Sequence, residues 1–421
     1  MKHPQNQRNT NGETCVMIAE AAGDLHLTGA HFWLCHAGKT KRVLKLTASL
    51  GAANKSVAAE QWFLLRVGGP HIQTAVLRQT RASHQVEWQG SFAACQPGNY
   101  SLHVRSVFAN DVRDDASWNA SCSKLHDPMN STLLDLYVWE DGQTNHSAQG
   151  CANLWRWRTP PTDDARRQLQ RLRACGIPSS SSMTATCPHP HADPHNSRHA
   201  INLLTYVGKD RRPNERTMPG LCFVGDSQTR NVFNSVMCAF QGRLMEDRQS
   251  SHQICSDTRH SNTKYFGANY PSDWIARPLR ASLDLAQCGS VVMNFGQWPC
   301  SNRQPTPWPR ARFERELQQS LSVASHWAAQ RSRRLFFWAT NPSPFRRDMA
   351  ICPPSDWRFP HIIEAYNAIA KRVAARHNIT FIDTYSIVFQ LLDLSFDGAH
   401  YGGSIGHALA VTILDEVAEH T

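Results

Sequence analysis

The sequence lacks any long apolar run, and no stretch approaches the roughly 20 apolar residues that a membrane-spanning helix needs. Its first residues, MKHPQNQRNTNGE, also lack the apolar segment of a signal peptide. We therefore expect no stable membrane insertion of this chain. The sequence features described below suggest a secretory protein, and such a protein could carry an N-terminal anchor or signal that this sequence does not include.

The 13 cysteines include no CxxC pair, which argues against zinc-ribbon and thioredoxin patterns. Cys187, His189, His191 and His195 lie close together in a polar segment. Prolines separate them, and their spacing is not that of a regular ligand set. We interpret this segment as a surface loop and expect no metal.

Nucleic-acid motifs are also missing, although the formal net charge is +10. The charge suggests acidic partners, but the arginines are dispersed along the chain as isolated pairs. A solvated basic surface is the better interpretation, and we expect no nucleic-acid partner.

Cysteine is abundant for a cytosolic enzyme, and the chain carries Asn-x-Ser/Thr sequons. The sequons lie at Asn54, Asn99, Asn119, Asn130, Asn145 and Asn378. Both features predict the secretory pathway, such as the Golgi lumen, or the cell exterior. Some cysteines should form disulfides, and the odd total leaves a thiol or an intermolecular bond. We expect Cys222, in an apolar run, to be a buried and inert thiol.

The 421 residues predict two or three domains. After a flexible or disordered segment, 1–23, seven short alternating strands predict an all-β sandwich of immunoglobulin-like type over 24–145. It should fold independently and contribute no catalytic group. A connector over 146–219, with a helix at 163–175, should pack on the catalytic domain.

Residues 220–421 show an α/β pattern. Strands are expected at 290–296, 334–340 and 378–384. Helices are expected at 312–331, at 359–376 and after Gly403. This alternation predicts a parallel sheet covered on both faces, with a site at the carboxyl ends of its strands.

The stretch GLCFVGDSQTRN begins as a buried strand and breaks at Gly225-Asp226-Ser227. Helical spacing of apolar residues follows, so Ser227 lies where a strand passes into a helix. Backbone N–H groups at such a turn stabilise a developing negative charge, which suits a nucleophile. The alternative is that Asp226 or Ser227 caps the helix.

Two more groups fit a serine nucleophile. In SFDGAHYGG, Asp397 and His400 are three residues apart, so the carboxylate can orient an imidazole that reaches Ser227. Asn294 ends an apolar strand, where its amide can donate to an oxyanion. The structural alternatives are a capping Asp beside a surface His, and an Asn in an ordinary turn.

Together, GDSQTRNVFNSVMC, VVMNFGQWP and FDGAHY resemble the GDS, Asn-Gly and DxxH blocks of the PC-esterase branch of the SGNH/GDSL hydrolases. That branch includes the trichome-birefringence-like polysaccharide O-acetyltransferases. CANLWRWRT is similar to a Cys and Trp-Arg-Trp element of the same proteins. A preceding β-sandwich resembles the arrangement of neurexophilin and PC-esterase domain proteins. The resemblance covers about residues 150–421 and implies an SGNH-hydrolase-like three-layer α/β domain.

The resemblance implies that Ser227 is the nucleophile, His400 its general base and Asp397 the residue that orients His400. It also implies an oxyanion hole formed by the Ser227 N–H, the Asn294 side chain and a glycine. The candidates for this glycine are Gly242 and Gly267.

The chain departs from the family at two places. Gln297 stands where a histidine is common, and Tyr401-Gly402 where Trp-Cys is common, so acceptor specificity does not transfer. Candidate substrate contacts are Arg230, Gln297 and Trp298, with Trp308 as a further possible sugar platform. An ion pair for Arg230 and core packing for the tryptophans are the structural alternatives.

The predicted function is a carbohydrate (polysaccharide or glycan) O-acetyltransferase that acts through an acyl-serine. The alternative with the same triad is a carbohydrate acetylesterase. A third hypothesis is a glycan-binding or adhesion protein with a vestigial site. The expected partner is a carbohydrate acceptor. We expect no bound cofactor, and the sequence leaves the acyl donor open between acetyl-CoA and another acetyl donor.

Overall fold

The computed structural model describes two parts of the chain. Before residue 220 it describes strands β1–β11 alone. From there on it describes 220–245, 255, 263–301, 303–343, 357–392, 395 and 399–420. The expected helix at 163–175 and the Cys187–His195 segment lie outside the described residues.

The second part is built on a five-stranded sheet with the order β13-β12-β14-β15-β16, in which every pairing is parallel. Its strands are β12 (Leu221–Gly225), β13 (Lys264–Gly267), β14 (Ser290–Asn294), β15 (Arg334–Trp338) and β16 (Thr380–Ile382). The chain runs from β12 to one neighbour, β13, and then crosses to the other neighbour, β14. This reversal forms a topological switch point between β12 and β14.

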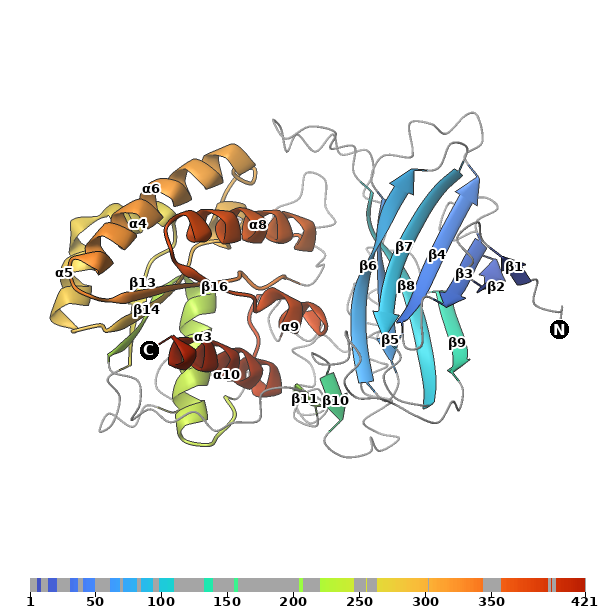
Figure 1. The fold of residues 1–421 in the computed structure, drawn as a ribbon, viewed down its shortest axis with the longest axis horizontal. Helices are drawn as coiled ribbons and strands as arrows, with labels where there is room; N and C mark the ends of the chain where they lie inside the picture. Colours follow the sequence, from blue (N-terminus) through green and yellow to red (C-terminus); the bar gives the residue numbers. More distant parts are fainter. Residues whose placement is uncertain are drawn as a thin grey trace.

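Helices cover both faces of this sheet (Figure 1). On one side lie α4 (Pro271–Ile275), α5 (Arg277–Leu285), α6 (Arg310–Ala329) and α8 (Pro360–Arg376). On the other lie α3 (Ser227–Phe240), α9 (Tyr385–Phe389) and α10 (Gly403–Glu419). The expected three-layer α/β architecture is confirmed. None of the described helices is long and apolar enough to cross a membrane.

The strands have apolar side chains on both faces because both are covered. In β12, Cys222 and Val224 join the core under α6 and α8, whereas Leu221 and Phe223 join the core under α3 and α10. This alternation is why the central strand reads as a continuous apolar run.

Two disulfides join parts of this region. Cys222 in β12 pairs with Cys288, just before β14, and Cys238 in α3 pairs with Cys255. The expectation that Cys222 is a thiol was therefore wrong, because the loop before β14 brings Cys288 against it. Among the described residues the buried thiol is Cys300.

The first part is strand-rich, and all seven expected strands are present. Two further strands lie within 1–23, where a flexible or disordered segment was expected, because residues 14–20 pair with the strand that follows them. The strands are β1 (Asn6–Arg8), β2 (Thr14–Glu20), β3 (His31–His36), β4 (Lys41–Ser49), β5 (Gln61–Gly68), β6 (His71–Arg81), β7 (Gln85–Ala93), β8 (Gly98–Ala109) and β9 (Thr132–Val138). They pair antiparallel in the order β1-β2-β3-β4-β7-β6-β5-β8-β9. An immunoglobulin-like sandwich and the domain boundaries stay predictions.

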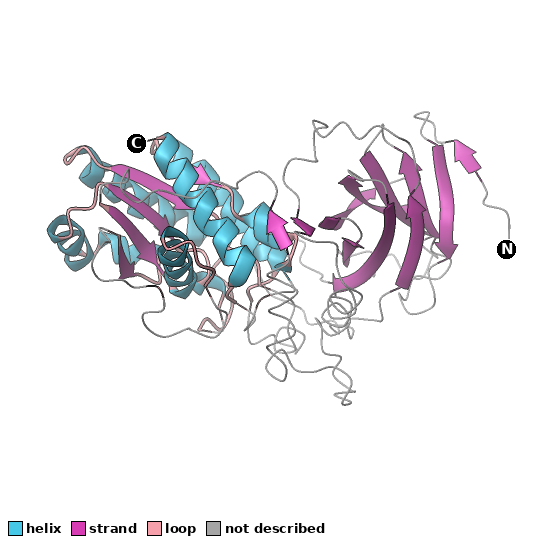
Figure 2. Ribbon diagram, turned by 90° about the horizontal axis from the view of Figure 1, so that it is seen from below, coloured by secondary structure: helices cyan, strands magenta, loops and turns pink. Residues whose placement is uncertain are grey.

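The strand β6 joins two sets of strands. Its residues 72–77 pair with β5, and its residues 78–81 pair with β7. The short strand β10 (Trp155–Trp157) also pairs with the start of β6 and with β11 (Leu204–Tyr206). Figure 2 shows the strand-rich and α/β parts next to each other, with the N-terminus on the former and the C-terminus on the latter.

Candidate active site

The candidate site lies at the carboxyl ends of β12 and β14. Gly225 ends β12 and Asn294 ends β14, and the two residues are paired in the parallel ladder. Ser227 and Gln297 follow these strands within three residues. They therefore flank the switch point, where α/β sheets bind ligands.

A tight turn presents Ser227. A Cβ on Gly225 would lie within 3.0 Å of Thr229 Oγ1 and of Asn294 O, so this close approach requires glycine. Asp226 is the N-cap of α3, and its Oδ1 accepts a 2.8 Å hydrogen bond from the Gln228 N–H. Ser227 is the first residue of the helix, and its hydroxyl is not needed for capping.

The Ser227 hydroxyl faces a histidine from the far end of the chain. His400 Nε2 lies 2.8 Å from Ser227 Oγ, within the range for proton transfer between a nucleophile and its base. Both residues are partly exposed. His400 precedes α10 and is anchored through its carbonyl, which accepts a 2.8 Å bond from Ser395 Oγ.

Asp226 is a buried carboxyl directly beside this pair. Burial raises the pKa of Asp226 to about 6. Hydrogen bonds from the Gln228 and Thr229 backbone and the charges of His400 and Arg358 act in the opposite direction and lower this pKa, but they do not offset the effect of burial. Oδ2 of this carboxyl is buried and has no hydrogen-bond partner in the described parts of the chain. A buried, half-bonded carboxyl is costly for folding, and such groups concentrate at functional sites.

Gln228 connects two loops of the site to α3. Its Nε2 donates to Ala399 O at 3.0 Å and to Asn341 O at 3.3 Å, and its Oε1 accepts from the Asn341 N–H at 3.1 Å. The segment before His400 and the loop after β15 are thereby tied to the helix that begins at Ser227. Gln228 was not predicted from the sequence, although a glutamine directly after a candidate nucleophile is a usable signal.

Asn294 is fully engaged in bonds that do not involve Ser227. Its Nδ2 donates to Trp338 O at 2.7 Å and to Thr340 Oγ1 at 2.9 Å, and its Oδ1 accepts from the Gly296 N–H at 3.2 Å. The residue is 0% exposed. These bonds join β14 to the end of β15, and they leave no amide hydrogen for the oxyanion expected from the sequence.

Gln297 has the amide that Asn294 lacks. The residue is 2% exposed, and its Nε2 has no hydrogen-bond partner among the described residues. It directly precedes the short 3-10 helix η3 (Trp298–Cys300). A buried, unpaired NH2 group needs an acceptor, and at this edge of the sheet a ligand oxygen can supply one.

The two glycine candidates differ in position. Gly242 follows the end of α3, and the 14-residue helix places it about 20 Å from Ser227. Gly267 instead ends β13 and pairs with Gly225 in the ladder. Of the two, only Gly267 shares an edge with Ser227, so Gly242 cannot belong to an oxyanion hole there.

The other predicted contacts are placed as follows. Arg230 is exposed on the first turns of α3. Trp298 is partly exposed and meets Tyr270 edge-to-face, with ring centroids 5.9 Å apart. Trp308 is 6% exposed and stacks on Tyr270, so it belongs to the core and not to a sugar platform.

Asp397 lies outside the described residues, so its orienting role stays a prediction. A residue that the sequence analysis missed is Arg358, which is 9% exposed and whose charge lowers the pKa of Asp226. It occurs in WRFP, just before the proline that begins α8. An arginine between aromatic residues at a helix start is the signal that could have identified it.

Comparison with known proteins finds no matching family model and no matching curated protein. Solved structures do match, over about half of this chain. A GDSL-like lipase from Bacteroides thetaiotaomicron shares 14% identity with a TM-score of 0.32, over 50% of this chain and 92% of its own. An acetyl xylan esterase, AlAXEase, shares 15% identity with a TM-score of 0.33, over 47% and 98%. An aryl esterase from M. smegmatis shares 11% identity with a TM-score of 0.32, over 48% and 99%. These similarities are too low to assign the chain to a family.

Proposed function

We propose that this chain is a serine-dependent acyl-transfer enzyme that moves acetyl groups to or from carbohydrate hydroxyls. The observation that carries the proposal is the 2.8 Å separation of Ser227 Oγ and His400 Nε2 at the start of α3. A serine that is not the cap, held against an imidazole at a switch point, matches the requirements of nucleophilic catalysis.

In this mechanism His400 Nε2 accepts the hydroxyl proton while Ser227 Oγ attacks the carbonyl carbon of an acetyl ester. The tetrahedral intermediate collapses, and the donor alcohol leaves with the proton from His400. In the second step His400 takes a proton from the acceptor hydroxyl, whose oxygen attacks the acyl-serine. Ser227 is then released with its proton restored. Asp397 is proposed to orient the imidazole.

The negative charge on the intermediate needs hydrogen-bond donors. We assign this role to the Ser227 N–H, at the positive end of α3, and to the Gln297 side chain. Gln297 Nε2, which has no partner within the described ranges, supports the assignment, as does the place of Gln297 after the strand next to β12. Asn294 then has the supporting role of holding β14 to β15.

The acceptor decides between transferase and esterase. The resemblance of the GDS, Asn-Gly and DxxH blocks to polysaccharide O-acetyltransferases favours a sugar hydroxyl, with partly exposed Trp298 and Arg230 as candidate contacts. The partial exposure of Ser227 and His400 favours the second candidate, an acetylesterase, because water can reach the acyl-serine.

We further propose that the enzyme works in the secretory pathway or outside the cell, and the Golgi lumen is the compartment that fits a glycan acetyltransferase. Two disulfides within the α/β region support an oxidising compartment. An exposed sequon asparagine, Asn378, supports it independently.

The test is mass spectrometry of the full chain after rapid quenching of its reaction with p-nitrophenyl acetate, with and without a panel of oligosaccharides. The proposal expects an acetyl adduct on Ser227. Acetylated sugar as the product identifies a transferase, and acetate alone identifies an esterase. An acetyl adduct on another residue contradicts the proposal. The absence of any adduct together with the absence of turnover also contradicts it, and supports a binding protein instead.

A further inference from the structure

One of the contacts between the strand-rich region and the α/β region joins a threonine to a glutamine. The Thr74 N–H in β6 donates to Gln390 Oε1 at 2.8 Å, and Thr74 Oγ1 donates to Gln390 O at 2.9 Å. Gln390 is the C-cap of α9. Thr74 pairs with Arg66 of β5 on one edge of β6, and its N–H points to the opposite edge, toward Gln390. Gln390 satisfies that N–H as a neighbouring strand would.

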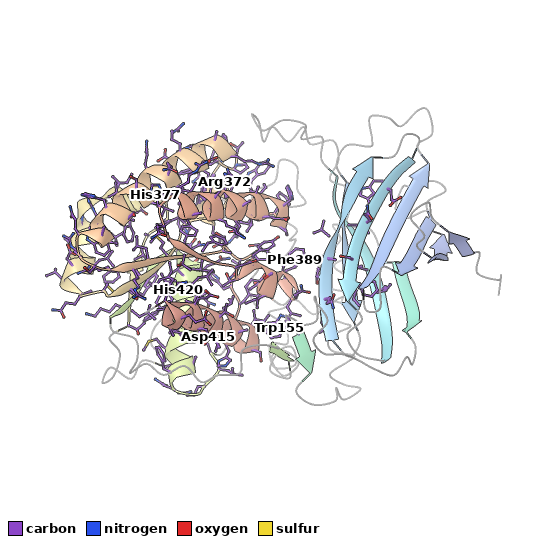
Figure 3. The ribbon with its side chains drawn as sticks, in the orientation of Figure 1. Trp155, Arg372, His377, Phe389, Asp415 and His420 are labelled. Atoms are coloured by element: carbon purple, nitrogen blue, oxygen red, sulfur yellow. A yellow bond between two sulfur atoms is a disulfide. The ribbon has the colours of Figure 1, made fainter. Side chains whose placement is uncertain are left out.

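A second bond lies beside the first. Trp155 of β10 is 0% exposed, and its Nε1 donates to Ile387 O in α9 at 3.0 Å. Trp155 pairs with Ile72 of β6, and both side chains belong to the same hydrophobic cluster as Ile387 and Tyr401. Figure 3 shows Trp155 and Phe389 at the side of the α/β part that faces β6. The core is therefore continuous from β6 to the residue that follows His400.

From α9 the contacts continue to the candidate base. Tyr401 Oη lies 3.0 Å from Leu392 O and 2.7 Å from Pro342 O, and it can donate to either carbonyl. The Tyr401 carbonyl accepts from Asn231 Nδ2 in α3. Ser395, between α9 and α10, bonds to the His400 carbonyl. The segment that carries His400 is thus held at one end by β6 and β10 and at the other by α3.

We propose that the strand-rich region positions His400: β6 and β10 hold α9, and α9 sets where the segment with His400 lies. Thr74, Trp155 and Gln390 are then positioning residues, and none of them touches the substrate. The inference rests on the proposed function, in which His400 is the base for Ser227. It gives the strand-rich region a role in the chemistry, which the sequence analysis did not expect.

The physical reason is that proton transfer depends steeply on distance. A displacement of about 1 Å in a catalytic group can cost about a hundredfold in rate. Loss of the Gln390 side-chain acceptor removes its hydrogen bond from the Thr74 N–H and so weakens the contact that holds α9 against β6. A purely stabilising contact would instead lower the melting temperature and leave the chemistry of the folded enzyme unchanged.

The test uses the full chain and two glutamine-to-methionine variants. Gln390→Met removes the acceptor and keeps the side-chain length. The matched control is Gln318→Met. Gln318 lies on α6, on the opposite side of the sheet from α9, and its side chain bonds to His377 at the end of α8. Gln390→Glu keeps an acceptor for the Thr74 N–H and serves as the rescue. The readout is the labelling rate of Ser227 by a fluorophosphonate.

We expect Gln390→Met to label about tenfold more slowly at temperatures where it is folded. Gln390→Glu should recover most of the rate, and Gln318→Met should label like the wild type. Equal labelling of wild type and Gln390→Met contradicts the proposal, as does an equal loss in Gln318→Met.

A second measurement separates this inference from the proposed function. Amide hydrogen exchange in the peptide 395–402 should increase in Gln390→Met and not in Gln318→Met, whether or not the chain is an enzyme. If the fluorophosphonate does not label Ser227 in the wild type, the proposed function is overturned, but the positioning of this segment is not. Unchanged exchange in Gln390→Met would overturn the positioning of this segment by the strand-rich region.

Discussion

Ser227 Oγ and His400 Nε2 lie 2.8 Å apart although 173 residues separate them in the sequence. The helices that follow them, α3 and α10, pack against each other, and Gly406 allows this approach because a Cβ there would lie 2.6 Å from Ser235 Oγ. The geometry of the pair therefore depends on two packed helices. Substitutions of Ser227 or His400 and substitutions of the residues around them should have separable effects on turnover and on stability.

Ser227→Ala should abolish turnover and leave stability almost unchanged. Asp226, not Ser227, caps α3, so removal of the hydroxyl leaves the cap intact. We expect turnover of p-nitrophenyl acetate to fall by several orders of magnitude, since the covalent step is lost. A melting temperature several degrees lower, with turnover retained, would mean that the hydroxyl is structural. His400→Ala should be similarly damaging, and the double variant should lose little more.

The two amides after β14 should respond in opposite ways. Gln297→Met should lower turnover about a hundredfold, the usual cost of one oxyanion donor, without destabilising the fold, because its Nε2 has no hydrogen-bond partner among the residues that the structure describes. Asn294→Ala should lower the free energy of unfolding by about 2 kcal/mol or more, because the Trp338 carbonyl and the Gly296 N–H lose their partner.

Chemical denaturation and steady-state kinetics measured on the same preparations separate these two effects. A stable Asn294→Ala variant with a hundredfold kinetic defect, beside a fully active Gln297→Met, would return the donor role to Asn294.

Asp226 should make stability depend on pH. Its carboxyl has a pKa of about 6 in the folded protein and an ordinary value of 3.8 when unfolded, so the folded state binds the proton more tightly. This contribution is complete below about pH 3.8 and is lost as the pH rises through about 6, amounting to about 3 kcal/mol. Asp226→Asn stays neutral, so its stability relative to wild type should rise between pH 4 and 7. Parallel pH profiles of the two proteins would show that Asp226 does not titrate in this range.

Asn378 should carry an N-linked glycan when the chain passes through a secretory pathway. The residue is exposed at the turn after α8, with a φ of 53° that asparagine adopts more readily than most residues. Asn378→Asp keeps this conformational tolerance and removes the acceptor. Glycopeptide analysis should find the glycan in wild type and lose it in the variant, with turnover unchanged. An unmodified Asn378 in secreted protein contradicts the prediction.

The sequence predicted what local pattern and chain order determine. Buried strands such as β14 and β15 appear as apolar runs, and Ser227 stands where such a run passes into helical spacing. The strand β13 was missed because its four residues are partly exposed and lack this pattern. The partners of side-chain amides are not encoded locally, so Asn294 and Gln297 could not be told apart. The contact of Thr74 with Gln390 spans 316 residues, and no local signal predicts it.

The two disulfides enclose the unit that presents Ser227. One anchors β12 at Cys222, five residues before the serine, and the other anchors α3 at Cys238, eleven residues after it. The nucleophile thus stands inside a short span whose two sides are each covalently tethered. Maturation of the proposed enzyme should therefore follow oxidation, and chain made in a reducing cytosol would carry the same residues on an untethered strand and helix. The specific activity of a preparation should therefore depend on how completely these two disulfides have formed.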